Sequence, residues 1–469
     1  MPGEYMMSHL VGNISCLRHD ASSGHRGKLA TKFMVGTVLS FSIHLPALSL
    51  SLMESYKAAL ESDPAFLGAR NDQVAGSENV AIGLSNLLPS VSASYGYSNN
   101  DGDRIALATR ATDQLRYESK VASLTLRQPL FNLDGWQRYQ GSLAQANYSD
   151  ARFAGARQDL IIRLTTAYLE ALLAEDQWRL GLAQRDAYKE NYIANQHMFE
   201  KGAGTRTDML ETRARYQLAE AQVLELENNV KNKRQELAII VGRDPGSLDV
   251  LAGRLPELPL EHRSAEAWES LARENNPEIQ AQRYSVTYSQ SEVERYRAGH
   301  YPRLDLVASH SRSTSESPVS YNYQLNTTAV GIQLSMPLYS GGSVNAQTRQ
   351  ATARLASDKA GLDATLLKTM VEVRKQFQLV ASSRLRMAAM DEAERSAIEA
   401  VEATRKSVAG GHRVNLDVLT SLQQLYTTRR DLSDARHGYL LALLRLRAAA
   451  GVLKGDDLIT VSACFQHQP

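Results

Sequence analysis

Apolar residues recur at helical spacing along two long segments of the chain that contain no proline. The chain has 13 prolines among its 469 residues, yet none lies between Pro129 and Pro245 and none between Pro337 and Pro469. Proline inside a helix costs about 3 kcal/mol, so proline-free segments rich in Ala, Leu, Gln, Glu and Arg favour helix. In the first segment the apolar spacing of three or four is carried by Ile161, Leu164, Tyr168 and Leu172.

A polar stretch that contains glycine divides each of these helical segments once. The stretch "EKGAGTRTD" occupies 200–208 in the first segment, and "AGGHRVNLD" occupies 409–417 in the second. Each segment therefore predicts two helices joined by a tight turn. A helix over 135–200 would be roughly 100 Å long at about 1.5 Å per residue. A globular domain does not use helices of that length, so we expect them to pack side by side as coiled coils.

Shorter stretches alternate apolar with small polar residues, which is the period of a strand. The alternation runs through 90–98, 123–126 and 327–335 and predicts two strand hairpins, at about 90–128 and about 303–336. One apolar face and one small polar face are typical of outer-membrane strands, although sheets of soluble proteins share the pattern. Four strands cannot close a barrel, which takes about eight, so a membrane-spanning form requires several copies of the chain.

The order of these elements occurs twice. The stretch "ESDPAFLGAR" at 61–70 matches "ENNPEIQAQR" at 274–283, where Asp63 and Asn276 are predicted helix caps before a proline. Further matched pairs are 87–96 with 300–309, 127–136 with 335–344, 206–210 with 415–419, and 239–245 with 448–454. The offsets stay between 208 and 213 residues, so we expect an internal duplication of helix, strand pair, long helix, tight turn and long helix.

Composition and motifs exclude several classes of protein. Lys and Arg number 52 against 51 Asp and Glu, so no basic excess indicates nucleic-acid binding. No motif for hydrolysis, phosphate binding or metal ligation is present, and we expect neither an enzyme nor a cofactor. His197, His412 and His437 are scattered and are expected on solvated helix surfaces or turns. Cys16 and Cys464 lie near opposite ends of the chain and form no metal-ligand pair or disulfide framework.

The first 49 residues have the features of an export signal. Lys28 and Lys32 precede the apolar stretch "FMVGTVLSFSIHLPALS", and Ala47 and Ser49 supply the small residues that a signal peptidase needs. A disordered tail before a buried helix is the alternative. No other stretch offers about 18 uninterrupted apolar residues, so a membrane would have to be crossed by strands closed into a barrel.

These features together resemble the TolC-like outer-membrane channel-tunnels of Gram-negative bacteria. The resemblance covers roughly 50–455 and rests on the duplicated order, on "QPLF" and "MPLYSGG" at the strand-to-helix junctions, and on "GTRTDML" and "GGHRVNLDVL" at the helix turns. It implies a mixed α/β membrane protein that forms a homotrimer. Each protomer would give four strands to one twelve-stranded β-barrel in the outer membrane, continued by a long α-helical barrel in the periplasm.

Domain boundaries follow from the repeat. We expect an export signal at 1–49, a first repeat at 50–245, a connecting equatorial segment at 246–264, a second repeat at 265–455 and a C-terminal tail at 456–469. Pro129 and Pro337 are predicted to end the strands, because proline donates no ladder hydrogen bond, and Pro89 and Pro302 make the reverse passage from helix to strand. Loops 99–117 and 312–326 are expected to face outside the cell.

The two helix turns form the candidate gate at the periplasmic end. Asp208 and Asp417 occupy matching positions just after the turns, and in a trimer each would form a ring of three carboxylates that favours cations. The resemblance implies that Thr207 with Asp208 belongs to the gate and that Arg413 helps to hold it shut. The alternative is that both aspartates are simply helix N-caps or acids of a first helical turn, and the two roles can coexist.

Two departures from the family pattern suggest that the contacts that hold the gate closed are weaker or differ from those of the family. Thr420 stands where the family can carry a second aspartate, and Val408 stands where some members have an aromatic residue.

Transport without catalysis is the expected function. The favoured form is the outlet of a type I secretion system that receives unfolded polypeptide from an inner-membrane ABC transporter and a periplasmic adaptor protein. The alternative is the outlet of a multidrug efflux pump driven by protons. A third possibility, a soluble periplasmic coiled-coil adaptor, would use similar helices without four alternating strands.

Overall fold

The computed structural model describes residues 50–251, 255, 260–315 and 323–466. The predicted export signal at 1–49, with Cys16, lies outside the described residues. The helices are α1 (Leu52–Ser62), α2 (Pro64–Ser77), α3 (Asn79–Ser85), α4 (Leu133–Glu200), α5 (Arg206–Val241), α6 (Ala265–Asn275), α7 (Pro277–Arg297), the 3₁₀ turn η1 (Ala298–His300), α8 (Ser343–Ala409), α9 (Asn415–Ala449) and α10 (Asp457–Ser462). The strands are β1 (Ser90–Ile105), β2 (Thr112–Phe131), β3 (Val250–Leu251), β4 (Arg303–Ser315), β5 (Tyr323–Ser335) and β6 (Phe465–Gln466).

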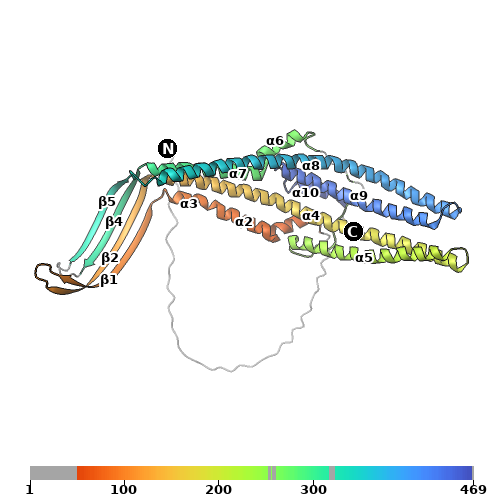
Figure 1. The fold of residues 1–469 in the computed structure, drawn as a ribbon, viewed down its shortest axis with the longest axis horizontal. Coiled ribbons are helices and arrows are strands. Elements are labelled where there is room, and N and C mark those ends of the chain that lie inside the picture. The colour runs from red at the N-terminus through yellow and green to blue at the C-terminus, as the bar shows by residue number, and fades with distance from the viewer. Residues whose placement is uncertain (1–49, 252–254, 256–259, 316–322, 467–469) are drawn as a thin grey trace, which may run out of the picture. The chain divides into compact units, whose positions relative to one another are not determined.

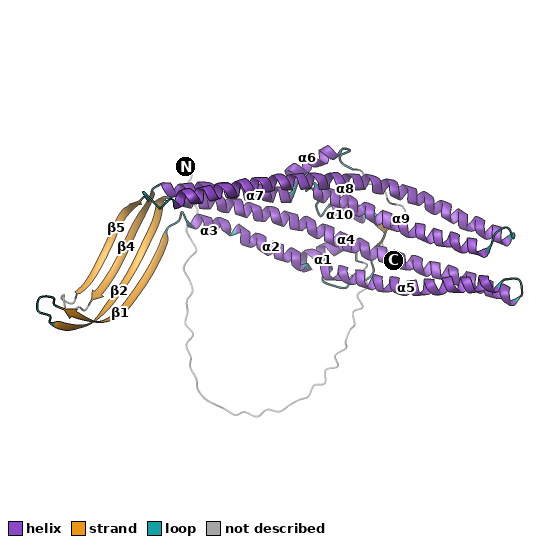
Figure 2. Cartoon of the chain, viewed as in Figure 1, coloured by secondary structure: helices purple, strands orange, loops and turns teal. Residues whose placement is uncertain are grey.

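Four long strands form one antiparallel sheet in the order β1-β2-β4-β5, so the two hairpins lie beside each other. The sheet lies at one end of helices α4 and α8, and the turns α4–α5 and α8–α9 lie at the other end (Figure 1). The predicted order of helix, strand pair, long helix, turn and long helix is therefore present in both halves of the chain (Figure 2).

Helices α4 and α8 contain 68 and 67 residues, close to the predicted lengths. Each packs along its partner, α4 against α5 and α8 against α9, and α9 also packs against α4. The side chains that join these helices near the turns are Tyr188, Ala219, Ala397, Val401, Val418, Leu419, Leu422 and Leu425. None of the helices in the described part of the chain combines the length and the apolarity that crossing a membrane requires.

A larger core lies midway along the long helices and is organised around Tyr168. Tyr168 is fully buried; its hydroxyl donates to the carbonyl of Leu50 at 3.0 Å and accepts from the amide of Asp249 at 3.2 Å. Its ring meets that of Phe465 edge to face at 5.8 Å. Short strands β3 and β6 pair in this region, so the connecting segment and the C-terminal tail both join the core. Cys464 is buried here as a free thiol.

Both predicted caps are present. Asp63 accepts from the amide of Phe66 at 2.8 Å, and Asn276 accepts from the amides of Glu278 and Ile279 at 2.9 and 3.2 Å. Pro64 and Pro277 follow them as first helical residues. Capping carboxylates and amides satisfy amide groups that have no partner within the helix. The caps therefore start α2 and α7 at matching places in the two halves.

The strands are longer than predicted. β1 continues to Ile105 and β2 begins at Thr112, so the predicted loop 99–117 is mostly paired strand. Cross-strand pairs of charged residues hold this polar part together, as in the ion pair of Arg104 with Asp113 at 2.8 Å. The prediction of a loop from polar composition alone was therefore wrong for most of this stretch. In the second hairpin 316–322 lies outside the described residues, while 312–315 and 323–326 belong to β4 and β5.

Three of the four junction prolines stand where they were expected. Pro89 and Pro302 immediately precede β1 and β4, and Pro337 follows β5 by two residues. The prediction for Pro129 was wrong in detail, because β2 continues to Phe131 through an irregularity between Pro129 and Phe131. The irregularity leaves Leu130 out of the register, while Pro129 itself is paired with Asp305. Pro129 lies past Arg127, the last residue of β2 that pairs with β1, so β2 has a partner on one side only at this point and tolerates a residue without an N–H group.

The prediction for His437 was also wrong. His437 lies on α9 and is 4% exposed, with its Nδ1 atom 2.8 Å from the carbonyl oxygen of Ser433. Burial lowers the pKa of this histidine and favours its neutral form. The charged groups of Asp176, Asp434 and Arg436 also act on this histidine, but their effects on its pKa are smaller than the effect of burial. His197 and His412 are exposed, as predicted.

Asp63 gives a pH-dependent test of the core. Its carboxylate is 3% exposed and is joined to Arg163 by two contacts of 3.1 and 2.8 Å, which lower the pKa of Asp63. We expect Asp63→Asn to lower the stability at neutral pH by about 1–2 kcal/mol, because Arg163 loses this partner while asparagine can still cap the helix.

The pH dependence has a definite sign. Because the folded-state pKa is lowered, this stabilisation is present above the unfolded pKa of about 3.9 and is lost as the pH falls through the folded pKa. Thermal unfolding midpoints from neutral to acidic pH measure the difference. The control is Asp159→Asn, which removes a 62% exposed partner of the same arginine and should cost about 0.5 kcal/mol or less. A wild-type advantage that persists unchanged in acid would contradict the assignment.

Candidate functional site

The two helix turns have the same backbone geometry. Gly202 and Gly411 both adopt left-handed conformations, with φ of 75° and 73°. The following amides, of Ala203 and His412, donate to carbonyl oxygens five residues earlier at 2.8 and 2.9 Å. This glycine-dependent arrangement ends a helix and satisfies its last carbonyl groups. Both pairs of long helices therefore reverse direction by the same device.

The first turn holds Asp208 as a capping partner. Thr205 accepts from the amide of Asp208 at 3.1 Å, and its hydroxyl also donates to the Asp208 carboxylate. Thr207 is exposed at the start of α5. Thr205 is therefore the helix cap and Asp208 is an acid of the first turn, which is the alternative to a gating role, and the two roles are compatible because Asp208 remains partly exposed.

The second turn is less constrained. Asp417 lies in the first turn of α9, and the capping position, Val414, offers no side-chain oxygen. Arg413 is exposed and, among the residues that the structure describes, has no ion-pair or hydrogen-bond partner. Thr420 donates to the carbonyl of Leu416, and Val408 packs against the apolar residues behind the turns.

The structure does not join the predicted gate residues of the two turns to one another within one chain. The contact between the two helix pairs lies further back, where Arg215 donates to Gln423 at 2.8 Å and Tyr426 donates to the carbonyl of Ala183 at 3.1 Å. Thr207, Asp208, Arg413 and Asp417 therefore lie on two separate turns.

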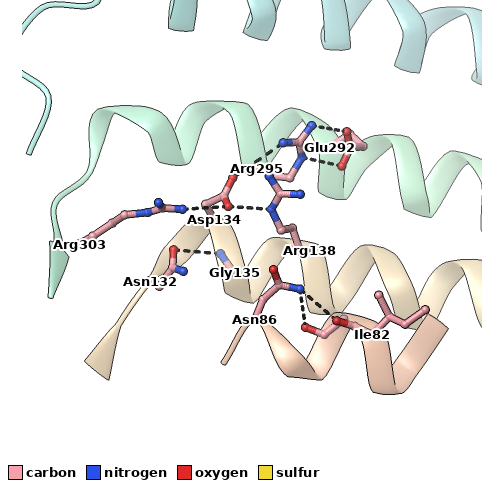
Figure 3. Close-up of polar contacts among 10 residues, drawn as sticks. Ile82, Asn86, Asn132, Asp134, Gly135, Arg138, Glu292, Arg295 and Arg303 are labelled. Atoms are coloured by element: carbon pink, nitrogen blue, oxygen red, sulfur yellow. Dashed lines mark hydrogen bonds and ion pairs between the residues drawn. The ribbon is translucent and has the colours of Figure 1, made fainter. Parts of the chain in front are cut away.

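The strand-to-helix junction holds a cluster of charges that the sequence reading missed (Figure 3). Asp134, in the first turn of α4, accepts from Arg138 at 2.8 Å and from Arg303 at the start of β4 at 3.1 Å. Arg295 of α7 lies 3.9 Å from the same carboxylate and makes two contacts of 2.7 Å with Glu292. One carboxylate thus ties the first long helix to the second strand pair and to the helix before it.

The same junction depends on a glycine. Asn132 caps α4 by accepting from the amide of Gly135 at 3.1 Å. A Cβ atom at Gly135 would lie 3.1 Å from the carbonyl oxygen of Asn86 at the end of α3, so a larger side chain would separate these elements. The motif "FNLDGW" carried a signal for this site, because an asparagine cap followed by an acid in the first turn marks a helix start.

The four-stranded sheet has two chemically distinct faces. One carries small hydroxyl side chains that pair across strands, such as Ser94 with Ser123 at 2.7 Å and Ser98 with Ser119 at 2.9 Å. The other face carries large apolar side chains that are 51–72% exposed, namely Val91, Tyr95, Tyr97, Leu124, Val330, Ile332 and Leu334. An apolar surface of this extent requires a covering phase or partner.

Comparison with known proteins assigns this fold to a family. The family described as outer membrane efflux protein matches residues 55–243 and 268–452. The chain belongs to the outer membrane efflux protein family. This family member is an outer-membrane protein of the TolC type from a Gram-negative bacterium, with a large helical periplasmic part.

Individual relatives of this efflux-family protein extend over most of its length. The proteases secretion protein PrtF of Dickeya chrysanthemi is 40% identical over 432 residues, 90% of this chain and 93% of PrtF. The alkaline protease secretion protein AprF of Pseudomonas aeruginosa is 42% identical over 423 residues, 89% of this chain and 88% of AprF. The solved structure of the CmeC outer membrane channel of Campylobacter jejuni has the same fold, with a TM-score of 0.74, 17% identity and coverage of 88% and 89% of the two chains.

The junction cluster predicts a specific loss of stability. We expect Asp134→Asn to destabilise the protein by about 1–3 kcal/mol, because the arginines around it lose a shared, largely buried acceptor. The thermal unfolding midpoint of the purified protein measures this change. Asp150→Asn is the matched control on the same helix, since Asp150 is exposed and accepts from Gln73 alone among the described residues. Equal effects of the two substitutions would show that the cluster does not stabilise the junction.

Proposed function

We propose that three copies of this protein form the outer-membrane channel of a type I secretion system. The main support is the similarity to two proteins named for the secretion of proteases, at 40% and 42% identity over 90% and 89% of the chain. In this proposal polypeptide passes from an inner-membrane ABC transporter and a periplasmic adaptor protein through the channel to the outside. The channel itself performs no catalysis and needs no cofactor, and the transporter supplies the energy.

Trimer formation is supported by surfaces that one chain leaves uncovered. β1 and β5 each have one unpaired edge in the described sheet, and twelve strands from three copies would close it into one barrel. The outermost long helices also expose apolar side chains. These are Leu218 and Leu224 on α5, 69% and 60% exposed, and Leu367, Val371 and Leu385 on α8, 68–70% exposed. Contact of α5 in one copy with α8 in the next would cover both sets.

Internal duplication is supported by two independent features. The family matches the chain in two successive segments of similar length, 55–243 and 268–452. Equivalent residues also perform equivalent tasks, since Asp63 and Asn276 cap matching helices and Gly202 and Gly411 form matching turns. In this proposal the repeats are 50–245 and 265–455, and the three copies supply six equivalent helix pairs to the periplasmic barrel.

The gate proposal rests on the exposure and the position of four residues. Asp208 and Asp417 follow the two turns and would form two rings of three carboxylates in the trimer, while Thr207 and Arg413 are exposed beside them. Arg413 finds no acceptor in the described part of its own chain, so its guanidinium is available to a carboxylate or carbonyl group of a neighbouring copy. Such contacts in water are individually weak, and the closed state would depend on several of them.

The alternative function is the outlet of a multidrug efflux pump, which the description of the family includes. The two functions differ in the transporter and adaptor that the channel serves. The hydroxyl-lined face of the sheet favours neither cargo, because it carries both small neutral side chains and the ion pair of Arg127 with Asp305. The identities of 40% and 42% to protease secretion proteins favour secretion.

Complementation tests the proposed function. In a bacterium that lacks its own secretion outlet but retains the ABC transporter and adaptor of a protease secretion system, we expect this protein to restore protease in the culture medium. The same strain should regain little resistance to detergents or dyes when an efflux pump replaces the secretion transporter. Restoration of resistance without restoration of protease secretion would instead support the efflux function.

The aspartate rings predict the ion selectivity of the channel. We expect the double variant Asp208→Asn plus Asp417→Asn to lower the preference for cations and to weaken block by multivalent cations, because two rings of three charges become neutral. Recordings of single channels in lipid bilayers measure both properties. Asp244→Asn, in an exposed loop outside the turns, is the control. Unchanged selectivity in the double variant would leave the two aspartates as acids of a first helical turn alone.

A further inference from the structure

The open edges of the sheet can be paired in several registers. A subunit seam that joins β1 of one copy to β5 of the next must place the apolar faces of the two strands on the same side. Side chains alternate with a period of two, so shifting one strand by two residues gives another register that meets this requirement. The choice among these registers sets the tilt of the strands and the width of the pore. This inference rests on the trimer proposed above.

The apolar face of each strand ends at a definite residue on the side of the hairpin loops. The uninterrupted apolar run ends at Tyr97 on β1, Ala122 on β2, Ala308 on β4 and Val330 on β5, while Ile105, further along β1, stands apart from this run among polar residues. The next residues on the same face are polar, namely Asn99, Lys120, His310 and Thr328. In a membrane protein this border marks one edge of the lipid-facing band.

The residues at which the apolar face ends are not paired with one another on every strand; the border shifts from one strand to the next. Tyr97 pairs with Lys120, so the border on β2, at Ala122, lies two residues closer to the helices. Ala122 pairs with Arg312, so the border on β4, at Ala308, lies four residues closer again.

From β4 to β5 the border does not shift, because Ala308 pairs directly with Val330, the border residue of β5. The border therefore shifts by six residues over three steps between strands, or two residues per strand. A band of lipid is flat, so this shift is a property of tilted strands.

We propose that the same step continues across the subunit seam, so that Ile332 of one copy lies opposite Tyr97 of the next. The border residue Val330 then lies two residues beyond Tyr97, opposite Asn99, as the step requires. Continuing toward the helices, Tyr95 faces Leu334.

This register gives a role to an exposed side chain beyond the end of β5. Met336, which is 52% exposed and follows the strand, comes to lie opposite Ala93. The neighbouring β1 strand would then extend the pairing of β5 toward Pro337.

The step also sets the width of the barrel. Each step shifts the border by two residues of about 3.3 Å along a strand, while neighbouring strands lie about 4.8 Å apart. The ratio of these lengths corresponds to strands tilted from the barrel axis by roughly 50–55°, more than the typical tilt of about 35–45°. A steeper strand occupies more of the circumference, and twelve such strands enclose a backbone diameter of about 30 Å, against about 18 Å for upright strands. The register thus gives a lumen wide enough for an extended polypeptide.

Pairs of cysteines test the register. We expect Tyr97→Cys combined with Ile332→Cys to form disulfides between copies fastest, giving covalent dimers and trimers on non-reducing gels. Directly opposite residues have Cα atoms about 4.5–5.5 Å apart, whereas residues displaced by two lie about 7–8 Å away, beyond the reach of a disulfide. The matched pairs are Tyr97→Cys with Val330→Cys and Tyr97→Cys with Leu334→Cys, which should cross-link at least about tenfold more slowly. The native Cys464 is 0% exposed and stays in all variants.

The outcomes separate this inference from the proposed function. Fastest cross-linking through Val330→Cys or Leu334→Cys would overturn the register, and so would a trimer, by mass in detergent, in which none of the three pairs cross-links. Both results leave the channel and its secretion activity standing. A protein that is monomeric by mass and inactive in secretion would overturn the proposed function itself, and the seam with it.

Discussion

Backbone hydrogen bonding controls this structure, because the strands of the sheet take their partners from neighbouring strands while the helices satisfy most of their peptide groups internally. The chain passes between helix and the four-stranded sheet four times, near Pro89 and Pro302, after Phe131 and near Pro337. At each change some amide and carbonyl groups lose a regular partner. The residues around these points are therefore chosen less for burial than for their ability to end one ladder and begin the next.

The Asp134 cluster shows how the two halves are locked together at such a point. A helix start carries partial positive charge, which favours an acid in the first turn of α4. Here that acid also accepts from Arg303 of the second strand pair, and Arg295 lies 3.9 Å away on α7. A single carboxylate therefore fixes the direction in which α4 leaves the sheet relative to β4. Since β4 and α7 belong to the second half, neither half can set this angle alone.

Much of the fold could be predicted from the sequence because it depends on local signals. The absence of proline, the glycines at 202 and 411, and the caps at Asp63 and Asn276 each act over one turn of chain. The failures involve partners distant in sequence. His437 has no local mark of burial, and the polar ends of β1 and β2 remain paired through ion pairs that composition cannot reveal. The sequence around Asp134 indicates an acid in the first turn of a helix, but its partner Arg303 on β4 lies 169 residues away.

The candidate gate stays a prediction, for a related reason. Thr207, Arg413 and Asp417 project from turns whose backbone is fully determined by glycine and by intrahelical bonds, so the fold places few demands on these side chains. In the proposed trimer, such residues would be free to contact another copy of the chain. The contrast between the two turns fits this division, because Asp208 is held by Thr205 whereas Asp417 has no such cap. The less constrained second turn, with Arg413 beside it, is then the turn that can move with the smaller loss of contacts within its own chain.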